Sequence, residues 1–483
     1  MCIRIALIRS KSKESCSFNK ILRHVVTIFK HRPCEWHSKQ DQEFEEESVD
    51  CFRWWESFND PTLNCLIERA SLQNLDLHIA LTRICEARLA EKGAQAALYP
   101  HIDGSISYSN INFNQRTLNN ILGCGRCKHD GQRNVNLFEA GFDAEWEIDL
   151  FGLRAHQTRA LEAKTASSQE AFAHIWVTLS AEIAKNYIEL RGYQQGLEVV
   201  ERNIQAQSDI LELTNGLMNS GFADTIDQLR GAEELNMLKA QKPPLEFLIQ
   251  KNIHHLSVLL GYPPAELVCE LETPTILPSL PCRRPIGVPS ELLRRRPDIR
   301  QAERDLAAAT ESVGAAVAAL FPRLSLTGFI GEITTFCTQG SWTSFIGPQV
   351  LFPIFNSKLL KEDVSANQIQ AQQAMLQYQK TVLEALEETE SAIAAFHYEL
   401  KKNQDLQEMK QASLKAYLLT LQLYQTGFKN YVEVQGQHRS FLTAENAFLQ
   451  SQIDLLIHYI ALYKALGGGW EIFCAPAISV ECD

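Results

Sequence analysis

The two halves of this sequence repeat one pattern, and this internal duplication limits the folds that the chain can adopt. Residues 213–222 (LTNGLMNSGF) return as residues 419–428 (LTLQLYQTGF). The run ALYPHI at 97–102 likewise matches ALFPRL at 319–324. Repeated segments of this kind fold into equivalent units. We therefore predict a duplicated architecture in which each half contributes the same elements in the same order.

The expected boundaries of the two copies follow from the positions of proline and glycine and from changes in composition. We predict a leader segment at 1–51, a first repeat at 52–270, a linker at 271–290, a second repeat at 291–470 and a tail at 471–483. Each repeat is expected to hold a helix, a β-hairpin and a pair of long helices. The two hairpins are placed at 101–150 and 321–355.

Stretches with little proline or glycine predict unusually long helices. In each copy a shorter helix, at 61–98 or 292–320, precedes a very long one, at 153–219 or 357–426. A shorter helix then returns. Apolar side chains recur at steps of three and four residues along the first long helix, which predicts one apolar seam on a polar rod. A rod of this length spans about 100 Å, so we expect an extended helical wall and not a compact globule.

The segment 138–150 (FEAGFDAEWEIDL) alternates apolar and polar residues without interruption. Successive residues of a strand point to opposite faces, so one face is apolar and the other is acidic. A transmembrane strand needs about 9–11 residues and turns its apolar face to lipid and its polar face to a wet lumen. The acids expected to line such a lumen are Glu139, Asp143, Glu145, Glu147 and Asp149. A half-buried strand in a soluble sheet is the alternative.

Three further runs, at 101–113, 321–334 and 341–355, have the composition of strands. Four strands do not close a barrel, for which about eight is the minimum. Open sheet edges are not tolerated in lipid. A sheet of this size that spans a membrane therefore requires several copies of the chain.

The composition argues against several classes of function. With 46 Lys and Arg against 58 Asp and Glu, the chain has a net charge of −12, which disfavours a nucleic-acid-binding surface. No apolar run reaches the roughly 18 residues that a transmembrane helix needs. Cys124 and Cys127 are spaced like metal ligands, but no second pair lies nearby, so we expect neither a metal site nor a cofactor. Because GxSxG, HExxH and Walker motifs are missing, we also expect no enzyme.

Three motifs lie in order around the duplicated core. WWESFNDPTL (54–63) leads the first helix, VPSELLRRRPDIRQAE (288–303) opens the second copy and YKALGGGW (463–470) closes it. In these motifs the chain resembles the outer-membrane factor family of TolC, and most closely its OprM/NodT-like lipoprotein branch. The resemblance covers about residues 52–470. It implies a homotrimer with a 12-stranded barrel in the outer membrane and a helical tunnel through the periplasm.

The predicted fold class is therefore mainly α with a membrane β-barrel, internally duplicated, with a long α-helical tunnel and four β-strands per chain. The resemblance implies a passive outer-membrane channel of a tripartite efflux system, which exports drugs, metals or other toxic small molecules from the periplasm. Its expected partners are a periplasmic adaptor protein, an inner-membrane pump and outer-membrane lipid. A duct for type I protein secretion and a soluble coiled-coil scaffold are the alternatives.

Members of this branch carry a signal peptide and a lipidated cysteine before the first helix. Cys16 and Cys34 precede that helix, but neither follows an apolar run. The resemblance therefore does not extend to a lipid anchor.

The turns that follow the two long helices are expected to form the periplasmic tips, which contact the adaptor in the family. The tip residues are Gly221, Phe222, Gly427 and Phe428. Glycine supplies the positive φ that a helix end often needs. A plain turn with both phenylalanine side chains packed inside is the alternative.

In OprM-like members, the return helix of the second copy carries an apolar residue and an acid that together constrict the periplasmic mouth. The corresponding positions are Val432 and Gly436 in the second copy and Ile226 and Arg230 in the first. Val432 keeps the apolar constriction, whereas Gly436 supplies no charge. Arg230 is expected to brace the tip against an acid such as Glu433 or Asp227. For Val432, a packed position in the helical seam is the alternative.

Overall fold

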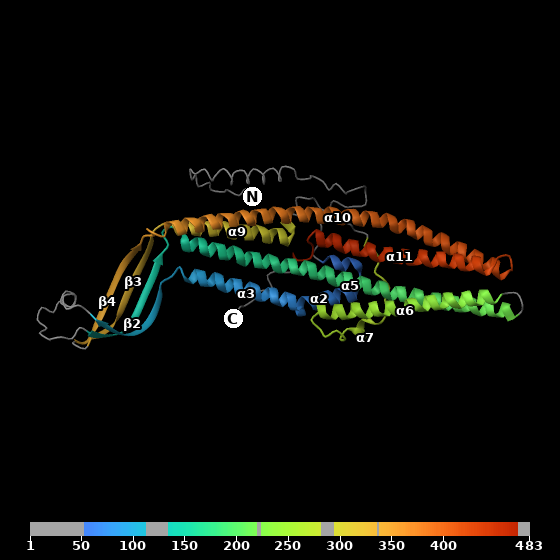
Figure 1. The fold of residues 1–483 in the computed structure, drawn as a ribbon, viewed down its shortest axis with the longest axis horizontal. Helices are drawn as coiled ribbons and strands as arrows, with labels where there is room; N and C mark the ends of the chain where they lie inside the picture. Colours follow the sequence, from blue (N-terminus) through green and yellow to red (C-terminus); the bar gives the residue numbers. More distant parts are fainter. Residues whose placement is uncertain (1–52, 113–133, 220–223, 282–293, 336–337, 472–483) are drawn as a thin grey trace. The chain divides into compact units, whose positions relative to one another are not determined.

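The computed structural model describes residues 53–112, 134–219, 224–281, 294–335 and 338–471. Long helices and one antiparallel sheet make up these ranges (Figure 1). The chain divides into two compact units. The helical unit comprises residues 1–82, 169–301 and 379–483, and the sheet unit comprises residues 83–168 and 302–378.

The two longest helices match their predicted bounds to within one residue. They are α5 (Leu153–Asn219) and α10 (Ser357–Gln425), with 67 and 69 residues. The other helices are η1 (Trp54–Phe58), α2 (Pro61–Gln73), α3 (Leu75–Ala96), α6 (Thr225–Leu259), α7 (Val268–Leu271), α9 (Pro297–Ala318) and α11 (Tyr431–Ala465). Among the described residues, no helix has both the length and the apolar character needed to cross a bilayer.

The prediction of one helix over 61–98 is wrong, because the chain breaks at Asn74 between α2 and α3. The backbone of Asn74 is extended, with φ −64° and ψ 129°. Its side-chain oxygen accepts a hydrogen bond from the backbone N–H of Leu77 at 3.0 Å, as an N-cap does. Its amide group donates to the carbonyl of Leu259 at 2.7 Å. A contact with a distant helix therefore fixes the break.

The helix predicted at 292–320 is also interrupted near its start, at Arg296. Helix α9 begins at Pro297, where proline is favourable because the first helical residue needs no N–H partner. The return helices α6 and α11 have 35 residues each. Helix α6 continues through Pro243 and Pro244 without ending.

The four strands form one antiparallel sheet in the order β1-β2-β3-β4. Their bounds are β1 His101–Asn112, β2 Asn134–Ile148, β3 Arg323–Thr335 and β4 Thr338–Leu351. Strand β2 starts four residues before the predicted run and ends two residues earlier, so Asp149 lies outside the sheet. In the isolated chain none of the residues 136–148 of β2 is buried, and the rings of Phe138 and Phe142 are exposed.

Aromatic side chains dominate one part of the core of the helical unit. Trp54 and Trp55 of η1 are almost fully buried, and Trp54 stacks on Tyr463 of α11 with 5.6 Å between ring centroids. Trp55 packs edge-on against Trp176 of α5 at 6.1 Å. Side chains of this size contribute most of the apolar area that a core removes from water. The two tryptophans are packing residues of this core.

Candidate functional site

The polar face of the sheet carries the first three acids of the predicted lumen set. Glu139, Asp143 and Glu145 share this face, because they lie two residues apart along β2 or a multiple of two. Hydroxyl groups of β1 support two of them. Ser107 Oγ donates to Glu139 Oε2 at 3.1 Å, and Ser105 Oγ donates to Asp143. The face therefore combines negative charge with hydroxyl groups.

Glu147 and Asp149 instead bind groups of the helix that follows the strand. Arg154 Nη2 lies 2.7 Å from Glu147 Oε2. The backbone N–H of Ala155 donates to Asp149 Oδ2 at 2.8 Å, which satisfies one of the N–H groups left open at the start of α5. These two acids stabilise the junction between strand and helix.

The turn after α10 has the conformation that the sequence predicts. Gly427 has a φ of +79°, and its N–H donates to the carbonyl of Tyr424 at 3.0 Å. The N–H of Phe428 donates to the carbonyl of Leu423 at 2.8 Å, which completes a Schellman-type helix end. The side chain of Phe428 is 80% exposed, so it does not pack inside the turn. The other tip residues, Gly221 and Phe222, lie outside the described residues.

The apolar gate residues are exposed in the single chain. Val432 is 50% exposed and Ile226 is 54% exposed. The seam positions of α11 are instead Tyr431 and Val434, which are buried. Gly436 faces open space, since a Cβ there would meet no atom within 4 Å. Val432 is therefore free to contact something outside its own chain.

Arg230 makes its ion pair within its own helix. Its Nη1 lies 3.8 Å from Asp227 Oδ1, one turn earlier. Glu433, the other acid considered, pairs with Lys429. The backbone carbonyl of Arg230 accepts a hydrogen bond from Gln435 Nε2 at 3.3 Å. The contact between the two tips thus uses the backbone of Arg230 and not its charge.

A stronger contact between α6 and α11 was missed by the sequence analysis. The fully buried carboxylate of Glu234 accepts a hydrogen bond from Arg439 Nε at 2.7 Å. Nearby, Gln207 Nε2 donates to the carbonyl of Gly231 at 3.3 Å. Glu234 lies between Gly231 and Leu238, at the spacing of the buried face of α6. An acid at a buried helical position indicates a charged partner, and the sequence shows this pattern at Glu234.

The three motifs that carried the resemblance meet in the helical unit. Trp176 Nε1 donates to the carbonyl of Gly469 at 2.8 Å, and Trp470 Nε1 donates to the carbonyl of Arg295 at 2.9 Å. Gly469 has a φ of +98°, and a Cβ there would lie 3.2 Å from Trp54 Nε1. The glycine motif therefore serves a close approach of the backbone to the tryptophans.

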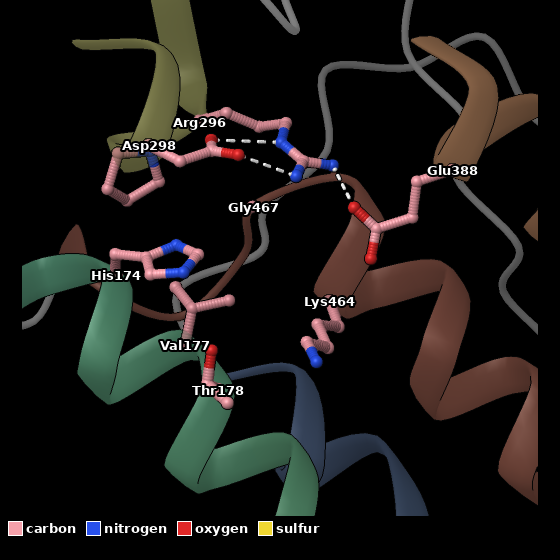
Figure 2. Close-up of a pocket in the computed structure, with 9 residues that line it drawn as sticks. His174, Val177, Thr178, Arg296, Asp298, Glu388, Lys464 and Gly467 are labelled. Carbon is pink, nitrogen blue, oxygen red and sulfur yellow. Dashed lines mark hydrogen bonds and ion pairs between the residues drawn. The ribbon is translucent and has the colours of Figure 1, made fainter. Parts of the chain in front are cut away.

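A cavity of about 270 Å³ adjoins this junction (Figure 2). Arg296 lies on its wall, and its guanidinium binds both carboxylate oxygens of Asp298, at 3.1 and 2.8 Å. The same guanidinium lies 2.7 Å from Glu388 Oε2. His174 faces the cavity (Figure 2), and its pKa is lowered, mainly by burial.

The ion pair in the cavity wall has a structural role. Burial acts to raise the pKa of Asp298, but the hydrogen bonds and charge of Arg296 outweigh it, so the pKa is lowered. Arg296 also donates to the carbonyl of Ala465 at 2.9 Å. The pair therefore fastens the start of α9 to the end of α11. Within the described ranges, no three His, Cys, Asp or Glu side chains form a group that would hold a metal; Cys124 and Cys127 lie outside those ranges.

Comparison with known proteins identifies the family. The family model described as "Outer membrane efflux protein" matches residues 66–261 and 288–468, which is most of the chain. This chain belongs to the outer membrane efflux protein family. The two matched segments cover both halves of the duplicated pattern.

The alignments between this chain and its relatives in the outer membrane efflux protein family cover most of both sequences. The solvent efflux pump outer membrane protein SrpC of Pseudomonas putida is 30% identical, over 86% of this chain and 87% of its own. The pyoverdine export outer membrane protein OpmQ of Pseudomonas aeruginosa is 28% identical, over 88% of this chain and 89% of its own. The structure of the outer-membrane channel OprN superposes with a TM-score of 0.83, at 30% identity, over 90% of this chain and 96% of that chain.

These comparisons confirm the predicted family, fold class and location. The family consists of outer-membrane efflux channels, and the chain is a passive channel of this kind. Relatives named as outer-membrane components of efflux pumps support a role in a multi-part export system. Neither the protein-secretion duct nor the soluble scaffold receives support from the comparisons.

Proposed function

We propose that this chain forms the outer-membrane duct of a tripartite efflux system that exports small toxic molecules. The sheet carries the proposal, because it has one apolar face and one acidic face in a member of an efflux family. Exposed apolar side chains line one face, and they include Ile102, Ile106, Phe142, Trp342 and Ile346. Such a face suits contact with lipid, and the opposite face suits a wet lumen.

The duct works as a homotrimer with a 12-stranded barrel. One chain supplies four strands, and β1 and β4 are the two edges of its sheet. Unpaired edges are costly in lipid, and closure needs at least about eight strands. Three copies joined edge to edge satisfy both requirements.

The partners are a periplasmic adaptor and an inner-membrane pump. The exposed ring of Phe428, at a turn fixed by Gly427, offers the adaptor an apolar contact. Val432, near the same turn, and Ile226, at the start of α6, constrict the mouth of the duct. The cargo consists of small organic compounds, in line with the solvent and pyoverdine exporters named among the relatives.

The test is to produce the chain with its cognate pump and adaptor in a bacterial host that lacks its own outer-membrane ducts. Efflux of a fluorescent organic dye should return, and the detergent-extracted protein should have a trimeric mass by light scattering. Gly427→Val should reduce crosslinking to the adaptor while the trimer persists. A monodisperse monomer that keeps its β-structure would contradict the proposal.

A further inference from the structure

One cross-strand row of the polar face combines carboxylates with aromatic rings. In the register of the sheet, Asp103 of β1 lies opposite Asp143 of β2. Asp143 lies opposite Phe329 of β3, and Phe329 lies opposite Phe345 of β4. Directly opposite residues share a face and lie about 4.5–5.5 Å apart at Cβ. The row therefore runs from two acids to two phenyl rings on the face assigned to the lumen.

The position of the Phe329 ring is fixed by two glycines. Gly141 and Gly331 lie opposite each other in the next row. A Cβ on Gly141 would lie 2.8 Å from Phe329 Cε2, and a Cβ on Gly331 would lie 2.7 Å from Phe329 Cζ. The ring thus occupies the space that two side chains would otherwise fill. A larger residue at either glycine would displace it.

The Phe345 ring lies beside the Phe329 ring, on the side away from Asp143. The two ring centroids are 6.1 Å apart, and the ring planes differ by 25°. Phe345 is 59% exposed, although it lies on the polar face. Its neighbour two residues along, Gly347, has open space where a Cβ would be. An aromatic ring therefore lies on the polar face beside a position that carries no side chain.

The charges nearby select the kind of solute. The electron-rich face of a phenyl ring attracts cations, and Asp143 stands beside Phe329 on the same face. Glu145 adds a further acid to that face on the adjacent row. We propose that this row binds organic cations with an apolar or aromatic body as they pass through the duct. The inference rests on the proposed function, because it takes the polar face as the lumen wall.

Planar-bilayer recording with the trimeric protein tests the inference. Benzyltrimethylammonium should block the potassium chloride current at lower concentration than tetramethylammonium, which has the same charged group without a ring. Benzenesulfonate, an aromatic anion, should block least. Phe345→Ser should raise the blocking concentration of benzyltrimethylammonium about fivefold, and Asp143→Asn should raise it as well.

Trp342→Ser is the matched control, because Trp342 is an exposed aromatic residue on the opposite face of the same strand. It should leave the block unchanged. Equal block by the two ammonium ions, or an unaltered block in Phe345→Ser, would overturn the inference but leave the proposed function intact. Absence of any potassium chloride current from the parent protein would instead contradict the proposed function.

Discussion

Arg439 reaches the buried carboxylate of Glu234 from the solvent side of α11, with Nη2 at 2.6 Å from Oε2. The guanidinium is about half exposed, whereas the carboxylate is fully buried. The two residues are 205 positions apart and belong to different copies of the repeat. This pair joins the return helices of the two copies.

Arg439→Ala should destabilise the helical unit by about 1–3 kcal/mol, because it leaves the Glu234 carboxylate buried without its charged partner. The midpoint of urea unfolding, followed by circular dichroism of the detergent-extracted protein, measures this loss. Arg230→Ala is the control. Its ion pair is exposed and 3.8 Å long, so the expected change is below about 0.5 kcal/mol. Equal midpoints for the two variants would contradict the prediction.

Acid should weaken the packing around His438. This ring is buried and stacks on Tyr417 with 4.9 Å between centroids. Burial lowers the pKa of His438 from its ordinary value of 6.5, and the charges of Glu234 and Glu445 offset only part of this effect. The folded state then binds fewer protons than the unfolded state between the lowered pKa and 6.5. Stability is therefore complete above this window and decreases as the pH falls through it.

Unfolding midpoints at roughly pH 7.5 and pH 5.5 test whether stability decreases as the pH falls. The loss of stability between the two should be smaller in His438→Gln than in the parent. His254→Gln, which removes an exposed histidine, should keep the full loss. A pH dependence that is identical in all three proteins would rule out His438 as its source.

Replacement by alanine should lower the stability of the protein at one glycine and raise it at another. Gly469→Ala should cost about 1–3 kcal/mol, because its φ of +98° disfavours any Cβ and Trp55 Cζ3 would lie 3.1 Å away. Gly436 lies within a helix beside open space, so Gly436→Ala should raise the free energy of unfolding by about 0.5–1 kcal/mol. Urea midpoints separate the two. The same sign for both changes would show that backbone conformation does not explain the glycine motif.

The lumen acids should make the duct prefer cations. Combined Glu139→Gln, Asp143→Asn and Glu145→Gln should reduce the permeability of potassium relative to chloride, because the local negative potential that concentrates cations is removed. Reversal potentials across a salt gradient measure the ratio. Glu332→Gln removes an acid from the opposite face of the sheet and should leave the ratio unchanged. Equal permeability of the two ions in the parent would refute the prediction.

Val432→Ser should raise the resting conductance of the reconstituted trimer. The exposed valine is proposed to meet its copies at the mouth of the duct, and a smaller polar side chain weakens an apolar constriction. Leu419→Ser removes an exposed apolar residue of α10 and should not alter the conductance. An unchanged conductance in Val432→Ser would place the constriction elsewhere.

The sequence was sufficient for the long helices, because their bounds follow from local signals. Proline and glycine mark their ends, and the apolar seam recurs at a helical period. The break at Asn74 was missed, since asparagine is tolerated within a helix and the reason for the break is a hydrogen bond to Leu259. Local patterns do not contain contacts between residues this far apart.

The site was predictable only in part for the same reason. Alternation along β2 places Glu139 and Asp143 on one face, because the side-chain period of a strand is fixed. It does not place Phe329 beside Asp143, since that needs the register between β2 and β3. Asp149 lies beyond the end of β2, where it accepts a hydrogen bond from the first turn of α5, and the alternation alone does not show where the strand ends.

The docking of Trp54 and Trp55 against the region of Gly469 also sets an order of events in biogenesis. These tryptophans are synthesised before the glycines that receive them, which lie about 400 positions later in the chain. The core around them closes only after this later segment has been synthesised, at the entropic cost of joining very distant segments. Until then the aromatic side chains that this core buries remain exposed. A chain that stops short of Gly469 lacks the acceptor for the Trp176 indole N–H and leaves this core incomplete.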